Sequence, residues 1–479
     1  MNMSLNWIAA LPELALLASA CVVLLADLFI TDRKRDYTFW HAQLALFFTL
    51  CCVASNWVMP STLALNGLYV HDTMSSVLKI AILLGTSAMF AYSRSHLVSR
   101  DIFSGEFYVL ALFAVLGMMV MVSGANMLVL YVGLELQALC LYAMVAMNRD
   151  SAQSSEAAMK YFILGALASG LLLYGMSMIY GATGSLDIAA VYKAANSPTV
   201  NKTFLVLGVV FVVSAIAFKL GAVPYHMWVP DVYQGATTPA TLFVASVPKI
   251  AAFAFALRIL VQGLQSTVND WQMMIVLIAG LSMVVGNLTA IMQTNFKRML
   301  AYSAIANMGF MLLGFAAGSV EGYAASMFYV ITYMVMTLAS FGAILLLSRA
   351  GFEADQMSDL KGLNTRHPGF ALILLVTMFS LSGIPSTVGF ISKFVVIEAL
   401  ITSKLVWLAV LAVIASLIGA FYYLRAVKLM YFDSPDDATP IVPDQAPYWL
   451  LCANALLIIV WGIFPQWLIG LCTRAMSLS

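Results

Sequence analysis

Charged residues are scarce in this chain: of its 479 residues, 9% are charged and 62% are hydrophobic. A soluble globular protein carries roughly 25% charged residues and 45–50% apolar residues. The 23 basic and 22 acidic side chains cannot cover a water-facing surface of this size, so a polytopic, all-α membrane protein is predicted. The net charge of +1 gives no basic face of the kind that nucleic-acid binding requires.

Residues that bind metals, haem or nucleotides are few and scattered. The six cysteines lie in apolar runs without a Cys-x-x-Cys pair, which is typical of small buried hydrophobic residues. The five histidines form no pair on one helix face, and no glycine-rich nucleotide loop follows a strand-like segment. No cofactor or metal is therefore expected in this chain. The first apolar run lacks a basic leader and is interpreted as a retained span.

Long apolar runs occupy most of the chain, and a bilayer core requires about 20 such residues per helix. Fourteen candidate spans are predicted, at 5–30, 38–58, 73–93, 107–123, 125–147, 157–181, 203–229, 239–263, 271–293, 297–318, 322–349, 368–402, 405–432 and 447–472. The segments 203–229 and 368–402 are overlong and contain proline, which removes a backbone hydrogen bond inside a helix. Both are predicted to be discontinuous helices.

The basic residues of the loops fall mainly on one side of the predicted membrane. One set of alternate loops holds thirteen, namely Arg33, Lys34, Arg35, Arg94, Arg100, Arg149, Lys297, Arg298, Arg349, Lys361, Arg366, Arg425 and Lys428. The opposite side holds four, namely Lys193, Lys202, Lys404 and Arg474. The positive-inside rule then places the first set in the cytoplasm and both termini outside.

The two broken segments share a local pattern. Phe218–Pro224 aligns with Phe379–Pro385 as Phe-x-Leu-small-small-β-branched-Pro, at an offset of 161 residues or five predicted spans. An odd number of spans inverts the second copy in the membrane, as in transporters built from inverted repeats. The predicted organisation is an N-terminal segment 1–104, repeats at 105–263 and 264–432, and a C-terminal helix in 433–479.

Six basic residues fall inside the predicted spans, namely Lys79, Lys160, Lys219, Lys249, Arg258 and Lys393. A lysine at the bilayer centre costs about 3 kcal/mol, so such residues usually face a protein interior and indicate an ion pathway. Lys79 and Arg258 lie near span ends and are expected to snorkel to the interface. Lys160 follows Glu156 by four residues, which allows an ion pair along the helix.

The buried bases outnumber the buried acids. Glu135 lies near the predicted midplane and cannot alone neutralise Lys219, Lys249 and Lys393. Burial and mutual repulsion favour neutral lysine, so we favour a proton relay over a static set of ion pairs. His226 follows the Pro224 break, where it fits either a proton connection or a hydrogen-bonded loop histidine.

Several motifs together resemble the antiporter-like membrane subunits of respiratory complex I. The matching stretches include Phe218–Leu220, Val223–Ala236, Asn295–Ser303 and Ser382–Phe394, within a resemblance that spans roughly residues 100 to 435. The Asp231-Val-Tyr-Gln-Gly sequence is most similar to the N-type members of that family. The resemblance implies fourteen transmembrane helices with two inverted five-helix repeats, centred on the broken seventh and twelfth helices.

The resemblance also implies roles for individual residues. Glu135 matches the glutamate that pairs with the seventh-helix lysine, here Lys219. Lys249 matches the eighth-helix lysine, and Lys393 the twelfth-helix lysine near the outer exit. Two further matches are Lys160, on the sixth helix, and His226, after the seventh-helix break.

At the level of the assembly, the resemblance implies a subunit of a proton-translocating NADH:quinone oxidoreductase in the bacterial inner membrane. Flavin, iron–sulfur clusters and quinone would reside in partner subunits, and other antiporter-like and small membrane subunits would be neighbours. A stand-alone or multisubunit cation/proton antiporter fits the repeat and the buried lysines equally well. A purely structural membrane spacer is disfavoured, because buried unpaired lysines are costly.

Overall fold

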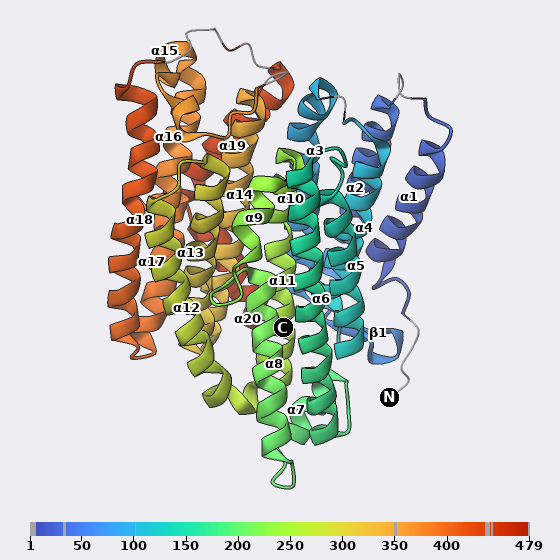
Figure 1. Ribbon diagram of the computed structural model, residues 1–479. Coiled ribbons are helices and arrows are strands. Elements are labelled where there is room, and N and C mark those ends of the chain that lie inside the picture. The colour runs from blue at the N-terminus through green and yellow to red at the C-terminus, as the bar shows by residue number, and fades with distance from the viewer. Residues whose placement is uncertain are drawn as a thin grey trace.

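The computed structural model of the protein is a bundle of long apolar helices (Figure 1). Most of them run between the same two ends of the bundle. The structure describes residues 6–31, 35–100, 102–348, 352–435, 441 and 444–477. The helices of the first half are α1 (Leu11–Asp27), α2 (Asp36–Ser55), α3 (Thr73–Ser99), α4 (Gly105–Ser123), α5 (Met127–Val145), α6 (Ala152–Thr183), α7 (Ile188–Ala195), α8 (Lys202–Leu220), α9 (Trp228–Gly235), α10 (Thr238–Ala245) and α11 (Pro248–Ala256). Those of the second half are α12 (Val268–Ile291), α13 (Phe296–Ala317), α14 (Val320–Leu347), α15 (Leu363–Arg366), α16 (Pro368–Ser382), α17 (Val388–Thr402), α18 (Val406–Phe432), α19 (Gln445–Ile463) and α20 (Gln466–Ser477).

Twelve helical segments within the described ranges are long and apolar enough to cross a membrane. The other two predicted spans correspond to α1, which has 17 residues, and to the pair α16 and α17, which have 15 residues each. The fourteenth predicted span, 447–472, is not one continuous helix. It ends as α19 at Ile463 and resumes as α20 at Gln466, because Pro465 lies at the junction.

Both predicted helix breaks are present. α8 ends at Leu220 and α9 begins at Trp228, and α16 ends at Ser382 and α17 begins at Val388. At each break a glycine follows the helix in the left-handed conformation, which ends a helix at little steric cost.

A third break lies in the segment 239–263, which was predicted as one continuous span. α10 ends at Ala245, and the capping Ser246 leaves the helical conformation with φ −106° and ψ −82°. Pro248 then occupies the first position of α11, where its missing N–H costs nothing. The segment Leu257–Gly263 continues as a π-helix. The span therefore contains two departures from α-helical geometry that apolar length alone does not reveal.

A small β-hairpin departs from the predicted all-α fold. β1 (Thr62–Ala64) pairs antiparallel with β2 (Tyr69–His71), with Thr62 opposite His71. The hairpin lies in the connection between α2 and α3. It reaches the same end of the bundle as α7, and the short helix α15 lies at the opposite end (Figure 1).

The centre of the bundle is α14, whose side chains are buried along nearly its whole length. It packs against α3, α10, α11, α13, α16, α17, α19 and α20. Because α14 contacts both α11 and α17, it lies between the two helices that carry Lys249 and Lys393. Of the basic residues that predicted the orientation, Arg33, Lys34 and Arg349 lie outside the described residues.

Candidate functional site

The first helix break presents backbone carbonyl groups to a lysine from another helix. Gly221 takes φ +74° and ends α8, so the last carbonyls of that helix have no helical N–H partner. The Nζ of Lys249, on α11, donates hydrogen bonds to Leu220 O at 2.8 Å and to Lys219 O at 3.5 Å. Lys249 is only 2% exposed, and its Nζ lies 5.2 Å from the centre of the Trp228 ring.

The second break repeats this arrangement with different residues. Gly383 takes φ +88° and ends α16. The Nζ of Lys393, on α17, donates to Leu381 O at 3.0 Å, to Ser382 O at 2.9 Å and to the Ser416 hydroxyl at 3.1 Å. In the first break the lysine comes from a neighbouring helix, whereas here it comes from the second half of the same broken helix.

The two amines are held by backbone dipoles rather than by carboxylates. The C-terminal carbonyls of a helix carry the negative end of its dipole, which favours a cation. Among the described residues, no carboxylate oxygen lies within 4.0 Å of the Nζ of Lys249 or Lys393. Carbonyl oxygens accept hydrogen bonds from a charged or a neutral amine, so each lysine can change its protonation without breaking an ion pair.

The pair implied for Glu135 and Lys219 is not closed in this structure. The Glu135 carboxylate, on α5, accepts a hydrogen bond from the Ser169 hydroxyl on α6. Within the described part of the chain, no carboxylate oxygen lies within 4.0 Å of Lys219 Nζ. Both side chains are partly exposed at the bundle surface. Lys219 therefore has no direct ion-pair partner in the described part of the chain.

Lys219 and Lys249 line the same small cavity. The cavity has a volume of about 20 Å³ and lies between α5, α6, α8 and α11. Tyr161 and Trp228, which stack with their ring centres 4.6 Å apart, form part of its wall. The structure thus places two of the predicted relay residues at one enclosed space.

The span pattern implied that Lys160 is buried, but its side chain is 43% exposed. It forms the expected ion pair with Glu156 at 2.7 Å and a second with Asp231, on α9, at 2.8 Å. Asp231 also pairs with Arg298 at 2.9 Å. Burial raises the pKa of Asp231, but the hydrogen bonds and charges of Lys160 and Arg298 outweigh it and bring the pKa below its ordinary value.

His226 lies between α8 and α9 and is half-buried. Its Nδ1 is buried and has no hydrogen-bond partner among the described residues. The ring also hydrogen-bonds the backbone at Pro224, so both interpretations of His226, a proton connection and a hydrogen-bonded loop histidine, stay open.

The prediction that Lys79 and Arg258 snorkel to the interface is wrong. Lys79 is 2% exposed and lies 2.6 Å from Glu13 and 2.7 Å from the Tyr69 hydroxyl. Arg258 is 1% exposed and donates to Asp72 at 2.7 and 3.0 Å. Each base is buried because a carboxylate distant in sequence lies against it, and a buried charge is retained when it is paired.

Sequence reasoning also missed the burial of Lys297, which it used only for orientation. Lys297 is 3% exposed and donates to Ala236 O at 2.9 Å and to the Thr238 hydroxyl at 3.3 Å. It lines a polar cavity of about 340 Å³ with His96, Arg100 and Glu353. Burial raises the pKa of Glu353, but Lys297 and the hydrogen bond from Thr238 outweigh it, and the pKa lies below its ordinary value.

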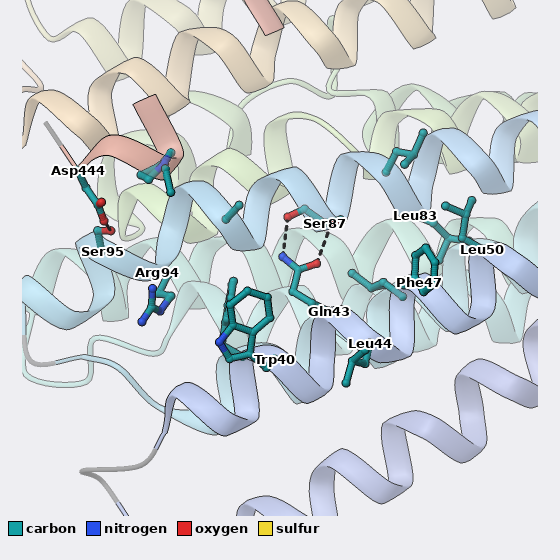
Figure 2. Close-up of a pocket in the computed structure, with 16 residues that line it drawn as sticks. Trp40, Gln43, Leu44, Phe47, Leu50, Leu83, Ser87, Arg94, Ser95 and Asp444 are labelled. Atoms are coloured by element: carbon teal, nitrogen blue, oxygen red, sulfur yellow. Dashed lines mark hydrogen bonds between the residues drawn. The ribbon is translucent and has the colours of Figure 1, made fainter. Parts of the chain in front are cut away.

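An apolar groove of about 530 Å³ lies apart from these residues, between α2 and α3 (Figure 2). Within it, Gln43 and Ser87 join the two helices by hydrogen bonds of 3.0 and 2.7 Å. None of the six predicted relay residues is among the described residues that line it. Among the described residues, no three or more histidine, cysteine, aspartate or glutamate side chains form a group that could hold a metal ion.

Comparison with known proteins gives consistent matches over the whole chain. The family model described as NADH:quinone oxidoreductase/Mrp antiporter, TM, matches residues 124–419. NADH-quinone oxidoreductase subunit N of Thiobacillus denitrificans (strain ATCC 25259 / T1) is 53% identical over 482 residues, which cover 100% of both chains. The subunit N of Methylovorus glucosotrophus (strain SIP3-4) is 52% identical over 98% of both chains.

The fold also matches a solved structure. A chain of respiratory complex I from Thermus thermophilus, with bound aureothin, superposes with a TM-score of 0.82 at 30% identity. The match covers 96% of this chain and 98% of that chain. The chain therefore belongs to the family of antiporter-like, proton-translocating membrane subunits formed by subunit N of NADH-quinone oxidoreductase.

Proposed function

We propose that this chain moves protons along a line of amines, from Lys219 through Lys249 to Lys393 and outward. The observation that carries the proposal is the repeated geometry at the helix breaks. Lys249 and Lys393 each donate to the terminal carbonyls of a half-helix, and neither has a carboxylate within 4.0 Å among the described residues. A proton can therefore arrive at and leave each amine while the same carbonyl groups hold the side chain in place.

Glu135 adjusts the protonation of Lys219 in this proposal. While Ser169 holds Glu135, no described carboxylate lies beside the Lys219 amine to stabilise its charged form. If Glu135 turned towards Lys219, the anion would favour the charged form. A change in the position of one carboxylate would thus set whether Lys219 takes up or releases a proton.

The step from Lys249 to Lys393 passes α14, which packs against both α11 and α17. Thr332, on α14, shares a hydrogen bond of 2.7 Å with Ser392, the residue that precedes Lys393. Tyr333 and Thr337 add hydroxyl groups to the same buried helix. We assign these polar groups to the route between the two lysines.

Lys160 and His226 belong to the entry side. Lys160, Asp231 and Arg298 form a charged cluster near the end of the bundle that carries most of the loop arginines. His226 lies at the first break, between α8 and α9, and its Nδ1 has no partner among the described residues. We assign to His226 the transfer of protons from the surface towards Lys219.

The topology that accompanies this function has fourteen spans. The twelve long helices, α1, and the pair α16 and α17 supply them. We assign residues 105–263 and 264–432 to two inverted repeats, each with a glycine-capped break and a lysine on its carbonyls. Residues 1–104 and 433–479 flank the repeats. The end rich in arginine faces the cytoplasm, and both termini lie on the periplasmic side of a bacterial inner membrane.

Electron transfer takes place in other subunits in this proposal. The relatives are subunits of NADH-quinone oxidoreductase, and flavin, iron–sulfur clusters and quinone are assigned to partner chains. The neighbours in the membrane would be other antiporter-like and small subunits. This chain would couple to them through conformational and electrostatic changes around Glu135 and Lys219.

The test is Lys249→Ala in the assembled complex, with NADH:quinone reductase activity and proton pumping measured in membrane vesicles. We expect assembly to persist and pumping to fall severalfold, because the amine on the Leu220 carbonyl is lost. Lys193→Ala, which removes an exposed lysine on α7, is the matched control and should pump normally. Normal pumping by an assembled Lys249→Ala complex would contradict the relay.

A further inference from the structure

A glutamine that the relay does not use lines the cavity shared by Lys219 and Lys249. Gln137, on α5, is 8% exposed, and its Oε1 is buried without a hydrogen-bond partner among the described residues. A buried polar atom without a partner costs free energy, and most such atoms in native proteins are bonded to protein or to ordered water. Gln137 Oε1 is therefore the kind of buried atom that an ordered water satisfies.

A cavity beside Gln137 has the size of one water. Gln137 lines the same cavity as Lys219 and Lys249, and the cavity volume is about 20 Å³. A buried water requires roughly 10–15 Å³ of such space and two to four polar partners. The cavity therefore has room for one water, and the two amines and the Gln137 amide supply three polar partners. The remaining wall is largely apolar and includes Leu134, Trp228 and Val244.

We propose that Gln137 is a positioning residue that holds one water between Lys219 and Lys249 and so completes the first step of the relay. The inference rests on the proposed function and adds a residue that the relay lacked. The Gln137 Oε1 accepts one hydrogen of the water. The other hydrogen then points to Lys249, and the oxygen lone pair faces Lys219.

The proton transfer balances without any other reactant. The Lys219 ammonium gives a proton to the water oxygen as the water gives its own proton to the lone pair of neutral Lys249. Two hydrogens of Lys249 are already directed at Leu220 O and Lys219 O, so its lone pair is left for the water. After the transfer, Lys219 is neutral, Lys249 is an ammonium and the water is unchanged.

The variants Gln137→Met and Gln137→Glu separate this role from packing. Both resemble glutamine in length, but only Glu retains an oxygen that can accept from the water. We expect Gln137→Met to lower coupled proton pumping by about threefold to tenfold, as the loss of one hydrogen bond would. High-resolution cryo-electron microscopy should show a water in the cavity of the wild-type complex and none in Gln137→Met. Gln137→Glu should keep the water and most of the pumping.

Asn454→Leu is the matched control. Asn454 also has a buried amide oxygen without a partner among the described residues, but it lies on α19 and lines a different cavity. The Asn454→Leu variant should pump protons at the wild-type rate. A water that persists in Gln137→Met, unchanged pumping in that variant, or equal losses in the Met and Glu variants would overturn the inference. Lys219→Ala and Lys249→Ala run alongside: if they lose pumping while Gln137→Met does not, the relay stands and only the role of Gln137 falls.

Discussion

The amine of Lys249 lies 2.8 Å from the carbonyl oxygen of Leu220, the last residue of a helix that ends at a left-handed glycine. The same relationship joins Lys393 to the end of α16, where its Nζ lies 2.9 Å from the carbonyl oxygen of the last residue, Ser382. Each half of the protein thus uses a glycine-capped helix end as the acceptor for a buried lysine. The geometry depends on the glycines as much as on the lysines.

Gly221→Ala should weaken pumping without removing any charged group. Its Cβ would lie 2.5 Å from a methyl group of Val229 and 3.6 Å from Lys249 Nζ, at a φ of +74°. The left-handed conformation alone costs a non-glycine residue about 1–2 kcal/mol. We expect lower thermal stability and reduced pumping, because the Leu220 carbonyl must shift.

Gly184→Ala controls for that strain. Gly184 has φ +71°, but no atom lies within 4 Å of its would-be Cβ. It should lose similar stability in thermal unfolding and retain its pumping per assembled complex. Equal pumping in the two variants would show that the position of the Leu220 carbonyl does not matter.

Ser416→Ala tests the second break. The Ser416 hydroxyl is the one side-chain acceptor for Lys393 that is observed among the described residues, at 3.1 Å. Removal of one hydrogen bond costs about 1 kcal/mol, so pumping should fall by up to about fivefold. Lys393→Ala should have a larger effect, and Thr199→Ala, at an exposed loop threonine, should have none. Pumping of Ser416→Ala and Lys393→Ala is compared in vesicles at equal complex content.

Glu13→Gln should destabilise the complex strongly, because it leaves Lys79 buried without its anion. Removal of one member of a buried pair typically costs about 3–5 kcal/mol. The double variant Glu13→Leu/Lys79→Met, which leaves no buried charge, should recover most of the loss. Thermal unfolding of the purified complex measures both. A double variant as unstable as the single one would contradict the assignment of this pair to structure.

The lowered pKa of Glu353 predicts how the stability of the protein depends on pH. Its pKa is lowered in the folded protein, so its contribution to stability is present above the unfolded pKa of about 4.3 and is lost as pH falls through the folded value. The difference in thermal stability between wild type and Glu353→Gln should therefore be constant from about pH 6 to 8 and should narrow below about pH 4. Asp270→Asn, at an exposed carboxylate, should show no difference from wild type near neutral pH. If the difference in thermal stability between wild type and Glu353→Gln increased at acid pH, that result would contradict the lowered pKa of Glu353.

The helix breaks could be predicted because their causes are local. Proline and glycine act on the backbone of their own turn, so the ends of α8 and α16 follow from the pattern shared by Phe218–Pro224 and Phe379–Pro385. The scarcity of charge likewise determined the membrane class. The break at Ser246 was not predicted, because a proline inside an apolar run can either kink a helix or end it, and the sequence does not distinguish the two.

Pairing between distant residues could be decided only by the tertiary structure. Arg258 and Asp72 are 186 residues apart, and no local pattern distinguishes a buried, paired arginine from one that snorkels. Gln137 resembles any polar residue of a helix until packing encloses its amide with two amines. The sequence alone thus determined the membrane class, the two proline-containing breaks and the supply of lysines, because hydropathy and backbone preferences are local. Only the tertiary structure determined which oxygen atom each lysine contacts, because those contacts depend on how the helices pack together.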